Sequence, residues 1–265
     1  MIIMTFMVAI PSYNRAEELK KYTLSTILNK NIDPACIDIF VANQQQYDFY
    51  KDTIPNDMYN EIIITEKGKM NAINHIRRYY RKGQKLLNLD DDVSEVEYLY
   101  NDTNVPLNDL SAYSEYIFTQ MRKNKCALAG IKRHRTARLK RHTLIITKFD
   151  VDGGFYWTIN NPSPKLDVYC DNCEDLEFTL KNIEYYGRVM ISNELSFGNE
   201  SLNKRNDLIR LASYEEMAKT RMKLKTEYPH LLRFAKKSKD GSFPYPVCCK
   251  EFNDRITIPT VVKKW

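Results

Sequence analysis

The first ninety residues alternate between short apolar runs and segments with helical spacing, and this alternation constrains the fold more than any other feature. Runs typical of buried strands occur at Met4–Ile10, Ile37–Ala42, Glu61–Thr65 and Leu86–Leu89. Residues with helical periodicity fill the intervals between them. The resulting β-α-β-α-β-α-β order is typical of a doubly wound α/β sheet. We therefore predict an α/β fold built on such a sheet.

The intervening segments carry their own start and stop signals. Asn14 is a candidate helix cap, with Glu17 three residues later in the capping-box position. A short helix is expected over Gln44–Asp52 and a longer one over Lys69–Arg81, which Gly83 would end.

The second half is less regular and shows no clear domain boundary, so a single domain is expected. Its predicted helices and strands alternate without a fixed repeat. The predicted helices are Leu107–Asn124, Cys173–Tyr186 and, with a possible break near Pro229, Arg205–Phe234; the predicted strands are Cys126–Ile131, Thr143–Phe149, Phe155–Asn160 and Arg188–Ser196.

Two polar clusters follow strands of the first half. Pro11–Arg15 comes directly after the first strand, and Asp90–Asp92 comes directly after the fourth. In open α/β sheets, ligands bind beyond the carboxyl ends of the strands. The two clusters are therefore predicted to meet in space although they are distant in sequence.

The Asp90–Asp92 triplet indicates a cation site. Neighbouring carboxylates repel one another by about 1 kcal/mol for close surface pairs, and Mg²⁺ or Mn²⁺, which prefer oxygen ligands, would remove that penalty. Side chains alternate along an extended chain, so Asp90 and Asp92 are expected to face one side and Asp91 the other. The alternative interpretation is a solvated acidic turn.

Charge points towards a polyanionic partner without requiring one. The formal net charge is +6. The segment from Lys132 to His142 carries six Lys or Arg, two His and no acidic residue. Such clusters bind nucleic-acid phosphates, although many charge runs are simply solvated loops. Further basic residues follow in Lys219–Lys225 and Lys236–Lys239.

The chain shows no secretory or membrane signal. No apolar run approaches the ~18 residues that span a bilayer, and the apolar N-terminus lacks a basic region and a cleavage site. The six cysteines then favour a reducing cytoplasm. Cys170 and Cys173 have half of a zinc-site spacing, but the adjacent Cys248 and Cys249 are poorly spaced for the other half.

Four ordered segments resemble the nucleotide-sugar-binding part of GT-A fold glycosyltransferases. The apolar strand continues into Pro11-Ser12-Tyr13-Asn14-Arg15, and Leu89-Asp90-Asp91-Asp92 resembles the family's Asp-x-Asp strand end. Gly68-Lys69-Met70-Asn71 resembles the segment ahead of that strand, and Glu174-Asp175 resembles a pair that opens a helix downstream. The resemblance covers roughly residues 4–195 and implies a GT-A, Rossmann-like mixed sheet flanked by helices.

The resemblance also implies roles for individual residues. Asp92 and Asp90 would hold Mn²⁺ or Mg²⁺, and Asp90 would also contact the ribose or the sugar. The expected nucleotide sugar is a uridine diphosphate sugar, and its other implied ligands are Pro11, Ser12, Tyr13, Arg15, Lys69, Asn71 and Asp91. A divalent metal would neutralise the diphosphate leaving group.

Asp175 is the candidate catalytic base, and Glu174 is the alternate. Inverting transfer needs a carboxylate that takes the proton of the acceptor hydroxyl. Acidic residues are also favourable in a first helical turn through the helix dipole alone. Asp152-Gly153-Gly154 has two interpretations as well: a close approach to a ligand, or a hairpin turn.

A narrower resemblance concerns the TET-associated glycosyltransferases, relatives of the base J glucosyltransferases. It rests on the Ile-Pro-Ser-Tyr opening, Asp-Asp-Asp-Val and Glu-Asp-Leu-Glu. It implies transfer of a hexose, glucose first, to hydroxymethylpyrimidines such as 5-hydroxymethylcytosine in DNA, often in phages, with Lys132–Arg141 contacting the DNA.

Two rival functions stay open. One is a glycosyltransferase acting on a polysaccharide, protein or small molecule; the other is a non-catalytic nucleic-acid-binding protein. The expected organisation is a core over residues 1–200, comprising a donor half (1–95) and an acceptor half (96–200), followed by a helical extension over 201–265.

Overall fold

The structure is a computed structural model that describes residues 5–100, 103–131, 143–147, 151–170, 172–199, 207–234, 246–248 and 252–257. Within these ranges, nine strands form one sheet in the order β14-β8-β10-β7-β9-β4-β1-β2-β3. Four neighbouring strands at one end run parallel: β4 (Lys85–Leu89), β1 (Phe6–Pro11), β2 (Ile37–Val41) and β3 (Glu61–Ile64). The predicted order of the first half is confirmed.

The remaining strands make the sheet mixed. β9 (Phe155–Ile159) runs antiparallel between β4 and β7 (Leu128–Ile131). β10 (Val189–Ser192) is parallel to β7, whereas β8 (Thr143–Thr147) is antiparallel to both β10 and β14 (Phe252–Thr257). The expected mixed α/β sheet flanked by helices is therefore confirmed.

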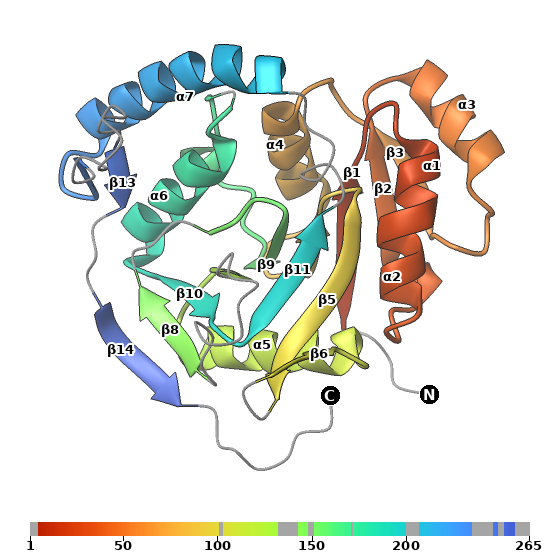
Figure 1. Cartoon of the computed structure of the whole chain (residues 1–265), viewed down its shortest axis with the longest axis horizontal. Coiled ribbons are helices and arrows are strands. Elements are labelled where there is room, and N and C mark those ends of the chain that lie inside the picture. The colour runs from red at the N-terminus through yellow and green to blue at the C-terminus, as the bar shows by residue number, and fades with distance from the viewer. Residues whose placement is uncertain are drawn as a thin grey trace.

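Helices cover both faces of the sheet because strand residues alternate between two cores (Figure 1). Val8 and Ile10 pack with the first helical segment (α1, η1 and α2) and also with α3 and α5, whereas Ala9 packs with α4. On this second side, a further cluster joins α4, α6 and α7. The helix bounds are α1 Ala16–Leu19, the π-helical turn η1 Lys20–Leu24, α2 Ser25–Leu28, α3 Gln44–Thr53, α4 Lys69–Tyr79, α5 Leu110–Lys123, α6 Glu174–Tyr186 and α7 Asp207–Glu227, with 3₁₀ turns η2 Pro34–Cys36 and η4 Pro164–Leu166.

A small second sheet, with the order β11-β5-β6, was not anticipated from sequence. β5 (Val93–Tyr100) leaves directly from the aspartate triplet and pairs with β6 (Thr103–Pro106) and β11 (Leu195–Asn199). The single strand predicted over Arg188–Ser196 is therefore wrong. The chain turns after β10 and crosses to the second sheet, where Leu195 and Phe197 join the main core.

The predicted capping role of Asn14 is also wrong. Arg15 precedes the first helical residue, and no side chain caps this end. Asn14 has a positive φ of 55°, and its amide oxygen accepts a hydrogen bond from Gln46 Nε2 at 2.6 Å. Its side chain thus ties the first strand's exit to α3 instead of capping the helix.

The C-terminal part contributes strands as well as the expected helix. α7 ends at Glu227, and β12 (Leu232–Phe234) pairs with β13 (Pro246–Cys248). β14 then lies at the edge of the main sheet. The division into a 1–200 core and a 201–265 extension stays a prediction.

Two other expectations concern thiols and membranes. Cys170 and Cys173 are both buried, and no group of three potential metal ligands is found within the described ranges. The side chains of Cys248 and Cys249 lie outside what the structure describes. None of the helices in the described ranges has the length and apolar character that crossing a membrane requires.

Candidate active site

A pocket of about 460 Å³ opens at the carboxyl ends of β1, β3 and β4. Segments from both halves of the chain meet there, as the strand-end rule predicted. The lining residues are Pro11, Ser12, Tyr13, Arg15, Phe40, Ala42, Thr65, Glu66, Lys67, Gly68, Lys69, Ala72, Asp90, Asp91, Asp92, Asp152, Gly153, Gly154, Asp175 and Asn199.

The turn that carries the three aspartates is held at both ends. Thr23 Oγ1 donates to the Asp90 carbonyl at 2.8 Å and accepts from the Val93 amide at 2.9 Å. The Asp90 amide donates to the Gly154 carbonyl at 2.9 Å. Thr23 lies in the π-helical turn η1, and such turns often occur at functional sites. The sequence signal for Thr23 was missed because it fitted a regular helical face.

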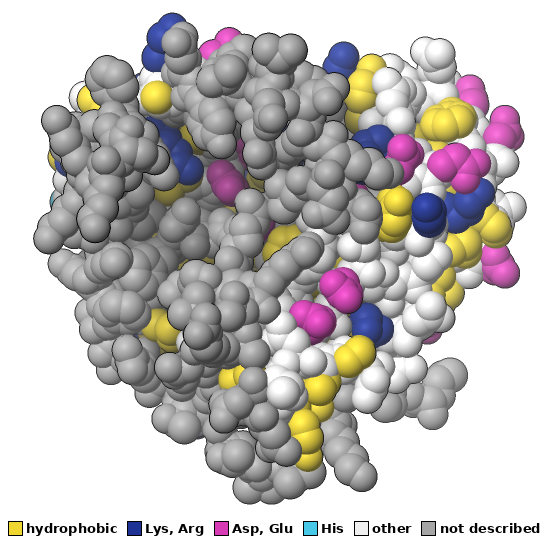
Figure 2. All heavy atoms as spheres, viewed as in Figure 1, with side chains coloured by type: hydrophobic (Ala, Val, Ile, Leu, Met, Phe, Trp, Pro, Cys, Tyr) yellow, Lys and Arg dark blue, Asp and Glu magenta, His cyan; other side chains and the backbone are white. Residues whose placement is uncertain are grey.

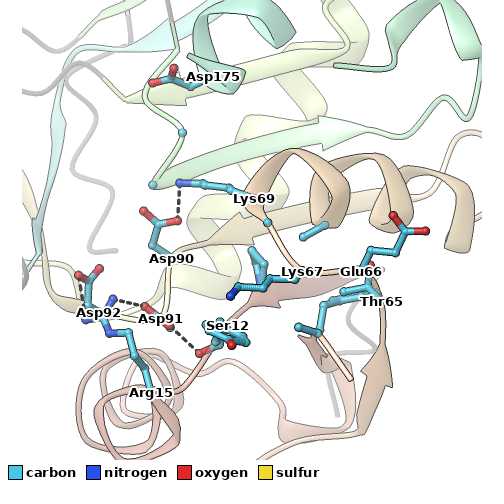
Figure 3. A pocket seen from close by; sticks show the side chains of 18 of the residues that line it. Ser12, Arg15, Thr65, Glu66, Lys67, Lys69, Asp90, Asp91, Asp92 and Asp175 are labelled. Carbon is cyan, nitrogen blue, oxygen red and sulfur yellow. Dashed lines mark hydrogen bonds and ion pairs between the residues drawn. The ribbon is translucent and has the colours of Figure 1, made fainter. Parts of the chain in front are cut away.

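Arg15 bridges two of the aspartates. Its Nη1 lies 2.7 Å from Asp91 Oδ1, and its Nη2 lies 3.3 Å from Asp92 Oδ2 (Figure 3). The predicted alternation, with Asp90 and Asp92 on one side, is therefore wrong. The chain makes a turn at Asp91 and Asp92 instead of staying extended, so both carboxylates contact the guanidinium of Arg15.

The hydroxyl groups of Ser12 and Tyr50 support Asp91 through a chain of hydrogen bonds. Ser12 Oγ donates to Asp91 Oδ2 at 2.6 Å and lies 2.6 Å from Tyr50 Oη, which accepts from the Arg15 amide at 3.0 Å. Burial raises the pKa of Asp91 to about 6, while Ser12 and Arg15 act in the opposite direction. The position of Arg15 is thus fixed through both its backbone and its guanidinium.

Lys69 links the aspartate turn to the helix α6. Its Nζ lies 2.8 Å from Asp90 Oδ1 and 4.0 Å from Glu174 Oε1. Burial by itself lowers the pKa of Lys69, but the charges of Asp90 and Glu174 outweigh burial and raise it well above its ordinary value. Lys69 therefore carries a positive charge within the pocket. Gly68, with a φ of 107°, makes the sharp entry into α4 that brings it there.

The paired glycines make room for two carboxylates. A Cβ on Gly153 would lie 2.8 Å from the Cβ of Asp175, and one on Gly154 would lie 2.9 Å from Asp90 Oδ2. Gly154 also donates its amide to Asp152 Oδ1 at 3.0 Å, so the segment forms a turn. The hairpin interpretation is wrong, because β9 pairs with β4 and β7 and not with the preceding strand β8. The close approach to a ligand stays a prediction.

Asp175 and Glu174 open α6 but differ in their surroundings. Asp175 lines the pocket, and its Oδ1 accepts from the Leu176 amide at 2.7 Å. Glu174 points towards Lys69, and burial raises the pKa of its carboxyl. In Figure 3, Asp175 lies on one side of the Lys69–Asp90 pair, and Asp91, Ser12 and Arg15 lie on the other.

Most of the residues singled out from sequence gather in this pocket. Pro11, Ser12, Tyr13, Arg15, Lys69, Asp90, Asp91, Asp92 and Asp175 all line it. Asn71 does not line it; its side chain donates to the Lys67 carbonyl at 2.9 Å because it belongs to the first turn of α4. The roles implied for these residues stay predictions.

Thr65, Glu66 and Lys67 are pocket residues that the sequence analysis missed. Lys67 Nζ lies 4.7 Å from the ring centroid of Tyr13, which is 38% exposed. Thr65, Glu66 and Lys67 follow β3 directly, so the strand-end rule that was applied to the first and fourth strands would have found these residues as well.

The carboxylate oxygens of the aspartate turn suit a hard divalent cation that the protein and a substrate would bind together. Asp90 and Asp92 both reach the pocket and offer carboxylate oxygens. No cluster of three acidic, histidine or cysteine ligands is found among the described residues. Mg²⁺ is commonly held by one or two carboxylates together with substrate phosphates, and two such carboxylates are present here.

The basic segment Lys132–Arg141 lies outside the described residues, so its expected contact with DNA stays a prediction. On the face shown in Figure 2, acidic and basic side chains lie close together on the right side of the view. The oligomeric state likewise stays open.

No protein-family model and no curated protein matches this chain. Among solved structures, S. aureus TarS 1-349 in complex with UDP-GlcNAc is similar, with a TM-score of 0.48, 12% identity and coverage of 86% of this chain and 73% of that one. A second is the mannosyltransferase PcManGT from Pyrobaculum calidifontis in complex with GDP-Man and Mn²⁺, with a TM-score of 0.43, 14% identity and coverage of 71% and 56%. A further TarS structure has a TM-score of 0.46 and 13% identity; this chain spans 36% of its length.

Proposed function

We propose that this chain is a metal-dependent glycosyltransferase of the GT-A type, which moves a hexose from a nucleotide sugar to a hydroxyl acceptor. One observation carries the proposal. A single pocket contains the aspartate turn, the basic side chains of Arg15 and Lys69, and the carboxylate of Asp175 at the start of a helix. A diphosphate donor needs the first two features, and proton removal from an acceptor needs the third.

The donor would lie along the mouth formed by β1, β3 and β4. Tyr13 and Lys67 offer an exposed ring and a charge where a nucleobase and its ribose need contacts. Arg15 and Lys69 stand on either side of the aspartate turn, so their charges suit the two phosphates. We expect a uridine diphosphate sugar, with glucose as the first hexose to test.

Asp92 and Asp90 are the residues that would hold Mn²⁺ or Mg²⁺ together with the diphosphate. When bound, such a cation neutralises the diphosphate and makes it a better leaving group. Arg15 and Lys69 already pair with these two aspartates. Arg15 and Lys69 keep the aspartate turn compact, and their side chains would rotate towards the phosphates of a bound donor.

Asp175 would act as the general base. As the acceptor oxygen forms its bond to the anomeric carbon, the bond from that carbon to the diphosphate breaks and the hydroxyl proton passes to the Asp175 carboxylate. Asp175 is favoured over Glu174 because it lines the pocket directly, whereas Glu174 points to Lys69. This arrangement implies inversion at the anomeric carbon.

We propose a hydroxymethylpyrimidine in DNA as the acceptor. The net charge of +6 and the basic run Lys132–Arg141 support a polyanionic acceptor. Enzymes that modify a base take it out of the stack, so the acceptor would enter the pocket as a flipped nucleotide.

The test is a nucleotide-release assay across donors, UDP-glucose included, with Mn²⁺. Each donor is assayed with and without DNA containing 5-hydroxymethylcytosine or 5-hydroxymethyluracil. We expect release that needs both metal and modified DNA. Asp92→Ala should abolish it, whereas the exposed Asp57→Ala should not. Metal-dependent release that is the same with and without DNA would contradict the proposed DNA acceptor. No release with any donor would contradict the proposal that the chain is a glycosyltransferase.

A further inference from the structure

A second cavity shares no lining residue with the candidate active site. It is an open groove of about 450 Å³ between helix α7 and the segment that leads into α6. From here on it is called the α7 groove. Its lining consists of Tyr169, Cys170, Asn172, Glu216, Lys219, Thr220 and Lys223.

The α7 groove displays an aromatic side chain on a firmly held backbone. Tyr169 is 65% exposed, although the amides of Tyr169 and Cys170 both donate to the buried Glu177 Oε2, at 2.7 and 2.8 Å. The preceding residue, Val168, is fixed through both its amide and its carbonyl by Asn74. A large exposed ring on an anchored backbone loses little conformational freedom when a ligand stacks on it.

Two lysines face the same groove from α7. Lys219 and Lys223 are one helical turn apart, so they present their charges along one side. Glu216 supplies an opposing charge, and Glu227 lies 4.0 Å from Lys223. Lys181 stands over the Tyr169 ring at 5.0 Å, and its Nζ lies 3.4 Å from Glu177 Oε1. Among the residues that line the groove, two lysines stand beside one glutamate.

The groove borders the residues proposed for catalysis. Arg221 of α7 is hydrogen-bonded to the thiol of Cys173, the residue that directly precedes Glu174 and Asp175. Leu224 of α7 packs in the same buried cluster as Leu176 of α6. These contacts hold α7 against the start of α6, and the groove includes Asn172, which precedes Glu174 and Asp175 closely in the chain.

We propose that the α7 groove binds the acceptor strand as single-stranded DNA, with Lys219 and Lys223 on its phosphates and Tyr169 stacked on a base that flanks the reacting nucleotide. This inference rests on the proposed function, because it takes the acceptor to be DNA. Lysines tracking a backbone beside an aromatic stacking surface are the combination that single-stranded nucleic acids require. The groove would thus deliver the flipped nucleotide to Asp175.

The test measures binding of a fluorescein-labelled oligodeoxynucleotide to the full chain by anisotropy at several salt concentrations, without donor. Lys219→Glu combined with Lys223→Glu should weaken binding at least about tenfold. It should also reduce the slope of log K against log salt by about 1.4, since each lost phosphate contact contributes about 0.7 for single strands. Tyr169→Ala should weaken binding by roughly tenfold with the salt slope unchanged.

Lys82→Glu combined with Lys123→Glu makes the same charge change at two exposed lysines outside the groove, and should leave most of the affinity intact. Equal losses in both double variants, or wild-type binding in both groove variants, would overturn the proposal. An abasic oligonucleotide bound as tightly as the base-containing one would overturn the stacking role of Tyr169. Binding of the nucleotide-sugar donor measured without DNA reports on the proposed function separately, because no groove residue lines the donor pocket.

Discussion

Gly153 lies so close to Asp175 that a Cβ atom on the glycine would come within 2.8 Å of the Cβ of Asp175. Real Cβ atoms do not approach so closely, so the turn before β9 and the first turn of α6 fit together only with glycine at this position. The position of the candidate base therefore depends on a residue that has no side chain.

Gly153→Ala should displace Asp175 and slow transfer by roughly a hundredfold, since a shift of about 1 Å in a catalytic group has an effect of that order. Donor affinity should change little, because Ser12 and Arg15 lie on the other side of the Lys69–Asp90 pair from Asp175 (Figure 3). The measurement is kcat for transfer beside the donor Kd. Gly83→Ala, at a φ of 82° and with open space around it, is the control. It should lower stability by about 1 kcal/mol and leave kcat unchanged; an equal loss of kcat in both variants would contradict this account.

Thr23→Val removes the hydroxyl that joins the Asp90 carbonyl and the Val93 amide. The change conserves shape but leaves two buried backbone groups without this partner. We expect a loss of about 1–3 kcal/mol in the free energy of unfolding, measured by urea denaturation, and weaker donor binding. Thr26→Val, three residues along the same helix, is the matched control. Wild-type stability in Thr23→Val would show that the turn is held by other contacts.

Tyr50→Phe tests the hydroxyl chain beneath Asp91. Tyr50 Oη contacts Ser12 Oγ at 2.6 Å and accepts from the Arg15 amide at 3.0 Å. Its removal should reduce the free energy of unfolding by about 1–2 kcal/mol, because the buried Arg15 amide loses its acceptor. Tyr59→Phe removes an exposed hydroxyl that bonds only to Asn56 in the described hydrogen bonds, and should change stability by less than about 0.5 kcal/mol. Similar losses in both variants would contradict the prediction.

Asp38 gives a pH dependence remote from the pocket. Burial raises the pKa of this carboxyl, although hydrogen bonds from Tyr80 and Asn60 act in the opposite direction. Because the folded pKa lies above the unfolded value of about 3.9, the folded state holds the proton more tightly. The stability of the wild type relative to Asp38→Asn should therefore be highest below about pH 4 and fall as pH rises through the folded pKa. A difference that grows with rising pH in urea titrations would contradict this sign.

Sequence patterns anticipated the parts of the fold that rest on local signals. Three of the four parallel strands, β1, β2 and β4, appear as largely apolar runs because both of their faces are buried. β5, the central strand of the small sheet, escaped prediction because its residues vary irregularly between buried and exposed. β10 and β11 were predicted as one strand because only the short Asn193–Glu194 turn separates these two buried strands.

The candidate site was predictable to the same extent. The strand-end rule brought Pro11–Arg15 to Asp90–Asp92, and the structure places both in one pocket. Tertiary distances decide the remainder. The sharing of Arg15 by Asp91 and Asp92 depends on a turn, and the approach of Gly153 to Asp175 depends on how α6 packs against β9. Neither relationship has a sequence spacing that would indicate it.

The most direct test of the central claim compares the wild type with Asp175→Asn in transfer from a nucleotide sugar in the presence of Mn²⁺. The readout is nucleotide release with acceptor, beside donor binding by titration. We predict that Asp175→Asn binds donor as the wild type does but transfers at least about a hundredfold more slowly, in keeping with the loss of a general base. Transfer at the wild-type rate in Asp175→Asn would contradict the account of this pocket as the site of glycosyl transfer with Asp175 as its base.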